Sequence, residues 1–184
     1  MSEIMRIIEE FKEDITQIEK WTEMKYSKII FNSEIDNWYH MTSTFNMKLL
    51  NKENIAIIIE DTNGNVFGAY IKTRIDMMEV SIYDNNAFVF NTRSNGRLPR
   101  PQKFAINQGS KAFVMYYSDF SNLFSVGGFY DGDDHATMVD ILLSKNGQCG
   151  CNQLSFNYNG IENALCGNQN FTIRRFLVIQ LEEK

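Results

Sequence analysis

Two neighbouring blocks of sequence decide the fold: Asp61-Thr62-Asn63-Gly64-Asn65-Val66-Phe67-Gly68-Ala69-Tyr70 and, after an irregular connection, Asp84-Asn85-Asn86-Ala87-Phe88-Val89-Phe90. An apolar run over 55–59 precedes the first block. The Thr-Asn-Gly-Asn that follows this run contains residues that tolerate a positive φ at the tip of a hairpin. We therefore predict consecutive β-strands over 55–59, 66–71 and 87–91, joined by tight turns.

The composition favours one β-rich globular domain. Of the 184 residues, 43% are hydrophobic and 13% aromatic, with 14 Phe and 8 Tyr against 2 Pro. This length suffices for one well-buried core, and the composition argues against disorder. The net charge of -5 gives no general attraction to phosphate or anionic lipid, so nucleic-acid binding would need a local basic patch.

The start of the chain, Met1 to Arg6, contains no apolar block preceded by positive charge. No later stretch reaches about 18 uncharged apolar residues, the length that a membrane-spanning helix needs. We therefore expect neither a signal peptide nor membrane insertion. The expected location is the cytoplasm, with the nucleus as the alternative.

An amphipathic pattern covers residues 1–25. Apolar residues recur there at steps of three and four: Ile4, Ile8, Phe11, Ile15 and Ile18. This spacing predicts a helix from Glu3 to about Met24 with an a/d seam, appended to a domain over 26–184. Two interpretations stay open: the seam packs on its own domain, or it drives self-association of two copies in a short coiled coil.

The remaining pattern is mostly that of strands. We predict a strand over 26–31, a helix over 38–49, and further strands at 111–117, 123–126, 137–143 and 172–181. Both prolines lie in a long loop over 93–103, and the section over 145–170 is expected to loop over the surface. No helical pattern separates the strands after Leu50, which disfavours a βαβ architecture. The expected class is therefore α+β, mostly β.

Candidate catalytic residues are few. The chain has two histidines, His40 and His135, and neither lies in a serine or cysteine nucleophile motif. We expect His40 to have a surface or packing role. His135 precedes three cysteines, Cys149, Cys151 and Cys166, which together have the elements of a zinc site, although their spacing is irregular.

An acidic turn next to His135 is the other candidate for a metal site. The carboxylates of Asp131, Asp133 and Asp134 could hold a hard cation such as Ca²⁺, yet the turn lacks the glycine and the glutamate of an EF-hand loop. We expect a solvated turn, free thiols and no cofactor. A redox or metal-dependent enzyme that uses Cys149, Cys151 and His135 remains an alternative.

Four basic residues gather in and beside the proline-containing loop: Arg93, Arg97, Arg100 and Lys103. No acidic residue occurs between Asn85 and Ser118. The pattern fits a solvated loop, a site for an acidic protein partner, or a nucleic-acid contact. Since no recognition helix, zinc finger or interleaved aromatic residue accompanies the arginines, a nucleic-acid-binding regulator is an alternative function and not the main one.

Three ordered motifs run through the chain. The segment over 64–70 is similar to G-x-x-F-G-G-Y, with Ala69 in place of the third glycine, and the segment over 84–90 is similar to D-x-x-A-F-L-F, with Val89 in place of the leucine. The segment over 164–178 fits L-x-G-x-x-x-F followed by a closing strand. In these motifs, residues 26–184 resemble the TLDc domain family, the domain of the oxidation-resistance and nuclear-receptor-coactivator proteins. The residues that carry the resemblance are Gly64, Phe67, Gly68, Tyr70, Phe88, Phe90 and Gly167.

The resemblance implies a two-sheet antiparallel β-sandwich flanked by short helices. It also implies a role in protection against oxidative stress and, for several members, an interaction with the vacuolar proton-pumping ATPase (V-ATPase). No catalytic centre is established for the family, so no catalytic residue is transferred, and the motif glycines are expected to be structural. We therefore expect a non-enzymatic protein-interaction module with a protein partner.

Overall fold

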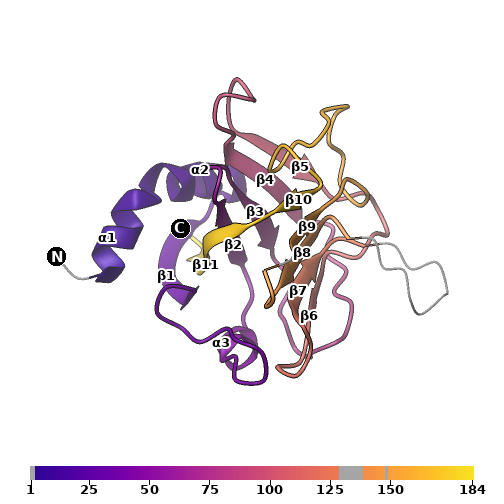
Figure 1. Cartoon of the computed structure of the whole chain (residues 1–184). Coiled ribbons are helices and arrows are strands. Elements are labelled where there is room, and N and C mark those ends of the chain that lie inside the picture. The colour runs from indigo at the N-terminus through magenta and orange to yellow at the C-terminus, as the bar shows by residue number, and fades with distance from the viewer. Residues whose placement is uncertain (1–2, 129–138, 148) are drawn as a thin grey trace.

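The computed structural model describes residues 3–128, 139–147 and 149–184, which form two antiparallel β-sheets and three short helices (Figure 1). The elements in chain order are α1 (Glu3–Glu10), α2 (Lys12–Thr22), β1 (Lys25–Asn32), α3 (Phe45–Leu49), β2 (Ile55–Asp61), β3 (Val66–Ile71), β4 (Phe88–Arg93), β5 (Gln102–Ala105), β6 (Phe113–Met115), β7 (Asn122–Val126), β8 (Ile141–Ser144), β9 (Cys149–Cys151), β10 (Asn170–Phe171) and β11 (Ile173–Glu182). The mostly β class and the two antiparallel sheets that the sequence predicted are confirmed.

The predicted hairpin forms the middle of the six-stranded sheet, whose strand order is β1-β11-β2-β3-β4-β5. Its turn forms as the sequence indicates: the carboxylate of Asp61 accepts hydrogen bonds from the backbone N–H groups of Asn63 and Asn65, at 2.9 and 2.8 Å. Gly64, at the tip, has φ of +82°, a backbone conformation in which other residues are strained. Local turn chemistry therefore sets the register of β2 against β3.

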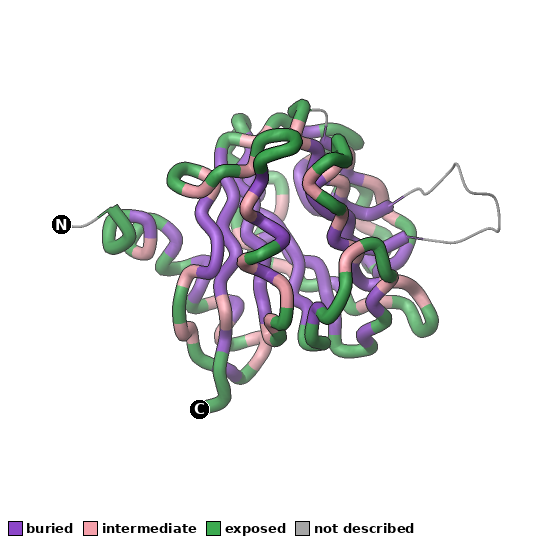
Figure 2. The backbone as a smooth tube through the Cα atoms, turned by 90° about the horizontal axis from the view of Figure 1, so that it is seen from below, coloured by how far each residue is buried: buried purple, intermediate pink, exposed green. Residues whose placement is uncertain are grey.

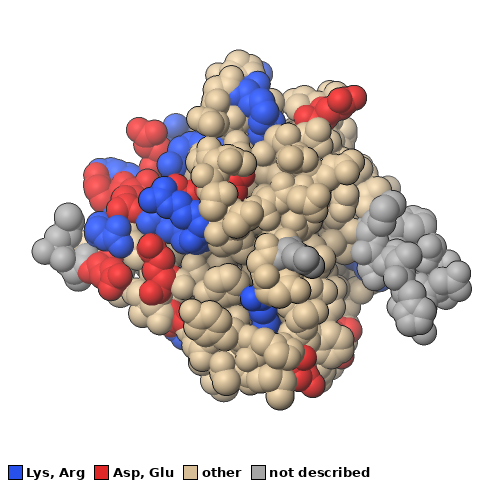
Figure 3. All heavy atoms as spheres, in the orientation of Figure 1, with Lys and Arg blue, Asp and Glu red and all other residues tan. Residues whose placement is uncertain are grey.

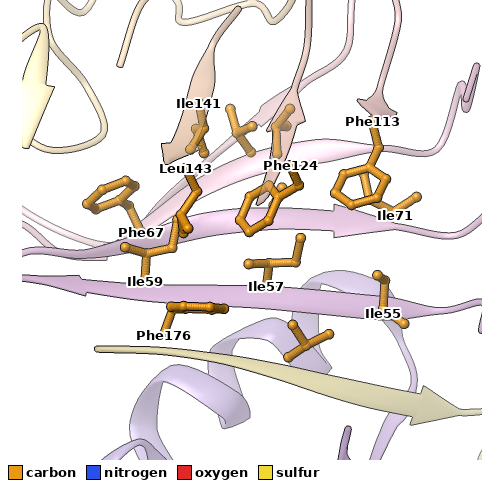
Figure 4. Close-up of a cluster of buried hydrophobic side chains, with 14 of the residues drawn as sticks. Ile55, Ile57, Ile59, Phe67, Ile71, Phe113, Phe124, Ile141, Leu143 and Phe176 are labelled. Atoms are coloured by element: carbon orange, nitrogen blue, oxygen red, sulfur yellow. The ribbon is translucent and has the colours of Figure 1, made fainter. Parts of the chain in front are cut away.

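The main hydrophobic core fills the space between this sheet and the five-stranded sheet, whose order is β10-β9-β8-β7-β6. Figure 4 shows Ile57, Phe67 and Phe176 of the first sheet directed toward Phe113 and Phe124 of the second. Side chains alternate between the two faces of a strand, so only every second residue of β2 enters this core. Burial stabilises the fold by about 1.5–3 kcal/mol for each large apolar side chain.

The helices α1 and α2 cover the outer face of the six-stranded sheet. There Ile58, Phe90 and Ile179 form a second apolar cluster with Phe11 and Ile18 of the helical segment. With both faces covered, every residue of β2 is buried, as the continuous purple of the central strands shows (Figure 2). A continuous apolar strand sequence is what such two-sided burial requires.

The predicted single helix over 3–24 is wrong in one respect: it is divided at Phe11 into α1 and α2. The buried face of α1 therefore differs from the predicted seam. Ile7 is buried there, whereas the seam residue Ile4 is 52% exposed and the seam residue Ile8 is only partly buried. Of the two interpretations left open, the structure shows packing on the domain for Phe11 and for the remaining seam residues Ile15 and Ile18. Self-association through the seam stays a prediction, and it would require these side chains to leave the cluster.

The predicted helix over 38–49 is reduced to α3 (Phe45–Leu49). Residues before it form turns, in which Trp38 packs edge-on against Phe176 with ring centroids 5.4 Å apart. Of the apolar residues at helical spacing there, Trp38, Phe45 and Leu49 pack on the main core, whereas Met41 is exposed. Tertiary packing has overridden a local periodicity in this segment.

The section over 145–170 does not simply loop over the surface, as the sequence suggested. It contains β9, and all three cysteines are buried in the main core. The other predicted strands are found within a few residues of their expected bounds, as β1, β4, β6, β7, β8 and β11. The acidic turn with Asp131, Asp133, Asp134 and His135 lies outside the described residues.

Candidate partner-binding site

The family-like motif residues build the scaffold. Gly68 lies in β3 where a Cβ atom would be 1.8 Å from the carbonyl oxygen of Ile57, so only glycine lets these strands approach. Phe67 points into the main core, whereas Tyr70, Phe88 and Phe90 line the cluster under α2. These positions determine the fold and are not available to a partner.

Arg93, the first basic candidate, is held by the helical segment. Its guanidinium donates hydrogen bonds to both carboxylate oxygens of Asp14, at 3.2 and 2.9 Å, and lies 5.5 Å from the ring centroid of Phe11. Asp14 is only 2% exposed. A buried carboxylate needs such a paired donor, so this contact stabilises the docking of α2.

Arg97 and Lys103 also bind groups of the same chain. Arg97 donates to the carbonyl oxygens of Asn163 and Leu165, at 3.0 and 3.2 Å. The ammonium of Lys103 lies 5.3 Å from the ring centroid of Phe88 and 3.4 Å from the carbonyl oxygen of Trp21. These two residues thus connect the loop to the turn before β10 and to the end of α2.

Arg100 differs from the other three basic residues of this loop. It is exposed, and its side chain has no hydrogen-bond or ion-pair partner within the described ranges. The structure therefore does not bring the four predicted residues together as a free basic surface. Partner binding by this loop stays a prediction that rests mainly on Arg100.

A charged network missed by the sequence analysis lies under α1. Arg175, which is 6% exposed, pairs with Glu60 at 2.6 Å and with Glu34 at 3.4 Å, and contacts Glu10 as well. The hydrogen bond from Arg175 holds the pKa of Glu10 below its ordinary value. Figure 3 shows side chains of both charges crowded over the helical segment, while most of the same face carries neither.

This network surrounds the residue at which the helices divide. Phe11, between α1 and α2, is fully buried with the guanidinium of Arg175 4.7 Å from its ring centroid and that of Arg93 5.5 Å away. An aromatic face attracts a cation at such distances. The sequence signal was weak, because the two arginines lie 79 residues or more from the helical acids, Asp14 and Glu10, that they bind.

At the other end of the molecule, two turns form an exposed apolar surface. Its members are Tyr39, Met41, Tyr117 and Phe120, which we name the aromatic–methionine patch. Their exposed fractions lie between 44% and 69%. The turns lie side by side at the bottom of Figure 1. A hydrogen bond joins them, in which the N–H of Met41 donates to the carbonyl oxygen of Ser118 at 2.8 Å. Exposed aromatic and methionine side chains are typical of protein-binding surfaces.

The backbone beneath this patch is held in place. The ammonium of Lys145 donates to the carbonyl oxygens of Ser118 and Phe120, both at 2.8 Å, and lies 3.3 Å from that of Tyr117. Burial lowers the pKa of Lys145. The ring of His40 lies 3.2 Å from the carbonyl oxygen of Phe120, which gives that histidine a packing role.

Met41 has φ of +68°, a left-handed conformation that is strained for a bulky residue. Strain of this kind is kept where the surrounding structure fixes it, and it is common at binding sites. The patch was missed by the sequence analysis because it joins segments about 80 residues apart and no local motif marks either of them.

The cysteines do not form the alternative metal site within the described residues. Across 3–128, 139–147 and 149–184, no group of three or more His, Cys, Asp or Glu side chains could hold a metal ion. Cys149, Cys151 and Cys166 are free thiols. The cation and zinc candidates at Asp131, Asp133, Asp134 and His135 lie outside these ranges.

Comparison with known proteins agrees with the fold. None of the described helices is long and apolar enough to cross a membrane. A comparison with curated protein sequences finds no match. The model of the TLDc domain matches residues 3–181, a range that includes α1 and α2 as well as both sheets. This chain belongs to the TLDc domain family.

Proposed function

We propose that the protein is a non-enzymatic interaction module that binds a protein partner through the aromatic–methionine patch. The observation that carries this proposal is the strained, exposed Met41 in a turn fixed by its contact with the 117–120 turn. A preorganised surface binds with a smaller loss of conformational entropy than a mobile one. Lys145 beneath the second turn contributes to that preorganisation.

The basic loop is the less suitable of the two surfaces. Three of its four cationic side chains bind Asp14, main-chain carbonyls or an aromatic ring of the same chain. Binding of phosphate by these groups would require breaking these contacts. For this reason we propose a protein partner and not a nucleic acid.

We further propose that the partner is a subunit of the V-ATPase and that binding contributes to protection against oxidative stress. Family membership supports this choice, because the resemblance to TLDc proteins implies both properties for several members. The patch supports binding of a protein partner, and only family membership supports the choice of the V-ATPase as that partner.

Affinity capture with the purified chain, from native cytosol before and after peroxide treatment, tests the partner. We expect V-ATPase subunits in the captured fraction, and we expect the purified peripheral sector of that enzyme to bind the chain directly. Capture should fall after the double substitution Tyr39→Ala and Phe120→Ala. The matched control is Met47→Ala, which removes an exposed methionine of α3 outside the patch. Equal capture by the double variant and the control would contradict the proposed site.

A further inference from the structure

A cavity of about 430 Å³ opens where the end of α2 meets the six-stranded sheet. Its lining comes from α2 and the residues that follow it, from β3, β4 and β5, and from the residues that follow β11. Ligand sites in proteins usually have volumes of about 300–1,000 Å³. None of the four residues of the aromatic–methionine patch lines this cavity, so the proposed partner binding does not use it.

One wall of the cavity is aromatic. Phe88 contacts two other lining rings, with centroid distances of 5.2 Å to Tyr70 and 6.1 Å to Trp21, and the Trp21 ring lies at 81° to that of Phe88. Phe88 and Tyr70 are 6% and 4% exposed, so packing fixes both rings. An aromatic ring that enters the cavity gains an offset or edge-to-face contact with such a wall. The wall therefore suits a ligand with a flat apolar part.

A buried hydroxyl adds a polar group to this wall. Oη of Tyr70 lies 3.2 Å from Oδ1 of Asn54 and 3.3 Å from Sδ of Met24, and it donates its single proton to only one of them at a time. Burial and the charge of Asp84 raise the pKa of Tyr70 to about 12, so the hydroxyl keeps its proton at neutral pH. No group of the described residues donates to this oxygen. Its capacity to accept a hydrogen bond is thus unused.

The mouth of the cavity carries charges of both signs. Its charged lining residues are all exposed: Glu23, Lys72, Lys103, Glu183 and Lys184. None of these five side chains forms an ion pair within the ranges 3–128, 139–147 and 149–184. Charged groups arranged around a hollow attract a ligand of complementary charge. A ligand that fits this mouth therefore meets both ammonium and carboxylate groups.

Two of these charged residues belong to different walls. Lys72 directly follows β3 in the sheet, and its backbone N–H donates to the carboxylate of Asp84 at 2.6 Å. Glu23 directly follows α2 and has φ of +61°. The left-handed residue after a helix is usually glycine or asparagine, so a glutamate there is strained, and strain of this kind is common at binding sites. The sheet wall thus carries an ammonium and the helical wall a carboxylate.

We propose that this cavity binds a small zwitterion with an aromatic side chain, which is the chemistry of a free aromatic amino acid. The carboxylate of the ligand pairs with Lys72, its ammonium pairs with Glu23, and its ring packs on Phe88 and Trp21. The hydroxyl of Tyr70 accepts a hydrogen bond from the ammonium. A simple anion would leave Glu23 without a partner and a simple cation would do the same to Lys72, so the mixed charge selects against both. The inference does not depend on the proposed protein partner.

The fluorescence of Trp21 tests the proposal in the full-length chain. The sequence has two tryptophans, so Trp38→Phe leaves Trp21 as the only reporter. The ligands titrated are L-phenylalanine, 3-phenylpropanoate, which lacks the ammonium, and 2-phenylethylamine, which lacks the carboxylate. We expect a saturable change with L-phenylalanine and binding at least about tenfold weaker for each analogue, because each leaves one charged group of the cavity without a partner. Equal binding of either analogue, or no saturation by L-phenylalanine below about 10 mM, would overturn the proposal.

Substitutions at exposed positions locate the site. Lys72→Gln and Glu23→Gln should each raise the dissociation constant of L-phenylalanine at least about fivefold, because each removes one charge that the ligand pairs with. Lys20→Gln is the matched control, since it removes an exposed lysine of α2 outside the cavity, and it should leave the constant within about twofold. Equal constants for Lys72→Gln and this control would overturn the proposal. Calorimetric titration of the unsubstituted chain with the three ligands decides the same question if Trp38→Phe fails to fold.

Discussion

The two ends of this molecule use their side chains in opposite ways. The 94–101 loop and its flanks, at the top of Figure 1, look like a binding site in the sequence, yet Arg93, Arg97 and Lys103 bind partners within the chain. The turns that carry Met41 and Phe120, at the bottom, have no motif, yet they expose apolar side chains on a fixed backbone. The comparison teaches that charge in a sequence marks a partner site only where the charge is unpaired in the fold.

The largest effect is expected at the helical end. Phe11→Ala removes a fully buried ring between two guanidinium groups. We expect it to lower the free energy of unfolding by about 3–5 kcal/mol, the usual cost of such a cavity. Chemical denaturation measures the change. The control Ile4→Ala, at an exposed position of α1, should lie within about 0.5 kcal/mol of the unsubstituted chain. Equal effects would mean that the helices do not pack on the sheet.

Arg93 and Arg100 form the next test, because they differ in pairing and not in charge. Arg93→Ala leaves the buried carboxylate of Asp14 without its donor. The expected loss is about 2–3 kcal/mol, since an unpaired buried charge is costly. Arg100→Ala should change the stability by less than about 0.5 kcal/mol. Thermal unfolding of both variants measures the two effects. A large loss of stability with Arg100→Ala would contradict the absence of a partner for that side chain.

Lys145 tests whether the patch is preorganised. Replacement of Lys145 by Ala removes the donor shared by the carbonyl oxygens of Ser118 and Phe120, and should cost about 1–2 kcal/mol of stability. Amide hydrogen exchange over 117–121 should become faster, while exchange in β2 should be unchanged. Unaltered exchange in the turn would mean that other contacts fix the patch.

The smallest effect concerns acid. The pKa of Glu10 is lowered in the folded chain by its hydrogen bond from Arg175, so its contribution to stability is present above its ordinary pKa of 4.5. That contribution should be lost as the pH falls below 4.5 through the folded value. Glu10→Gln should flatten this part of the stability profile, measured by denaturation at a series of pH values. The effect is small because Glu10 is partly exposed and solvent screens the pair. An unchanged dependence of stability on pH in Glu10→Gln would mean that Glu10 does not contribute to the network.

Much of the six-stranded sheet could be predicted from the sequence, because its signals are local. The turn at Gly64 and the apolar runs on either side predict β2 and β3 to within a few residues of their observed bounds. The division of the helix at Phe11 could not be predicted. A heptad-like spacing describes a free helix, whereas the sheet beneath determines which face of each short helix is buried.

The candidate sites were less predictable for a related reason. The partners of Arg93 and Arg175 lie far away in sequence, so their charges look unpaired until the fold brings the acids beside them. The patch depends on a contact between Met41 and Ser118, and no pattern in either segment indicates it. The role of these charged and apolar residues thus depends on contacts between distant segments, which the local sequence does not indicate.

The most direct test compares the two ends in one binding assay with the purified peripheral sector of the V-ATPase. The patch variant is Phe120→Ala, and the loop variant is Arg100→Glu. If the patch is the binding site, Phe120→Ala raises the dissociation constant at least about tenfold, as loss of a central aromatic contact does, and Arg100→Glu leaves it within about twofold. Loss of affinity only with Arg100→Glu would contradict the account and assign the partner to the basic loop.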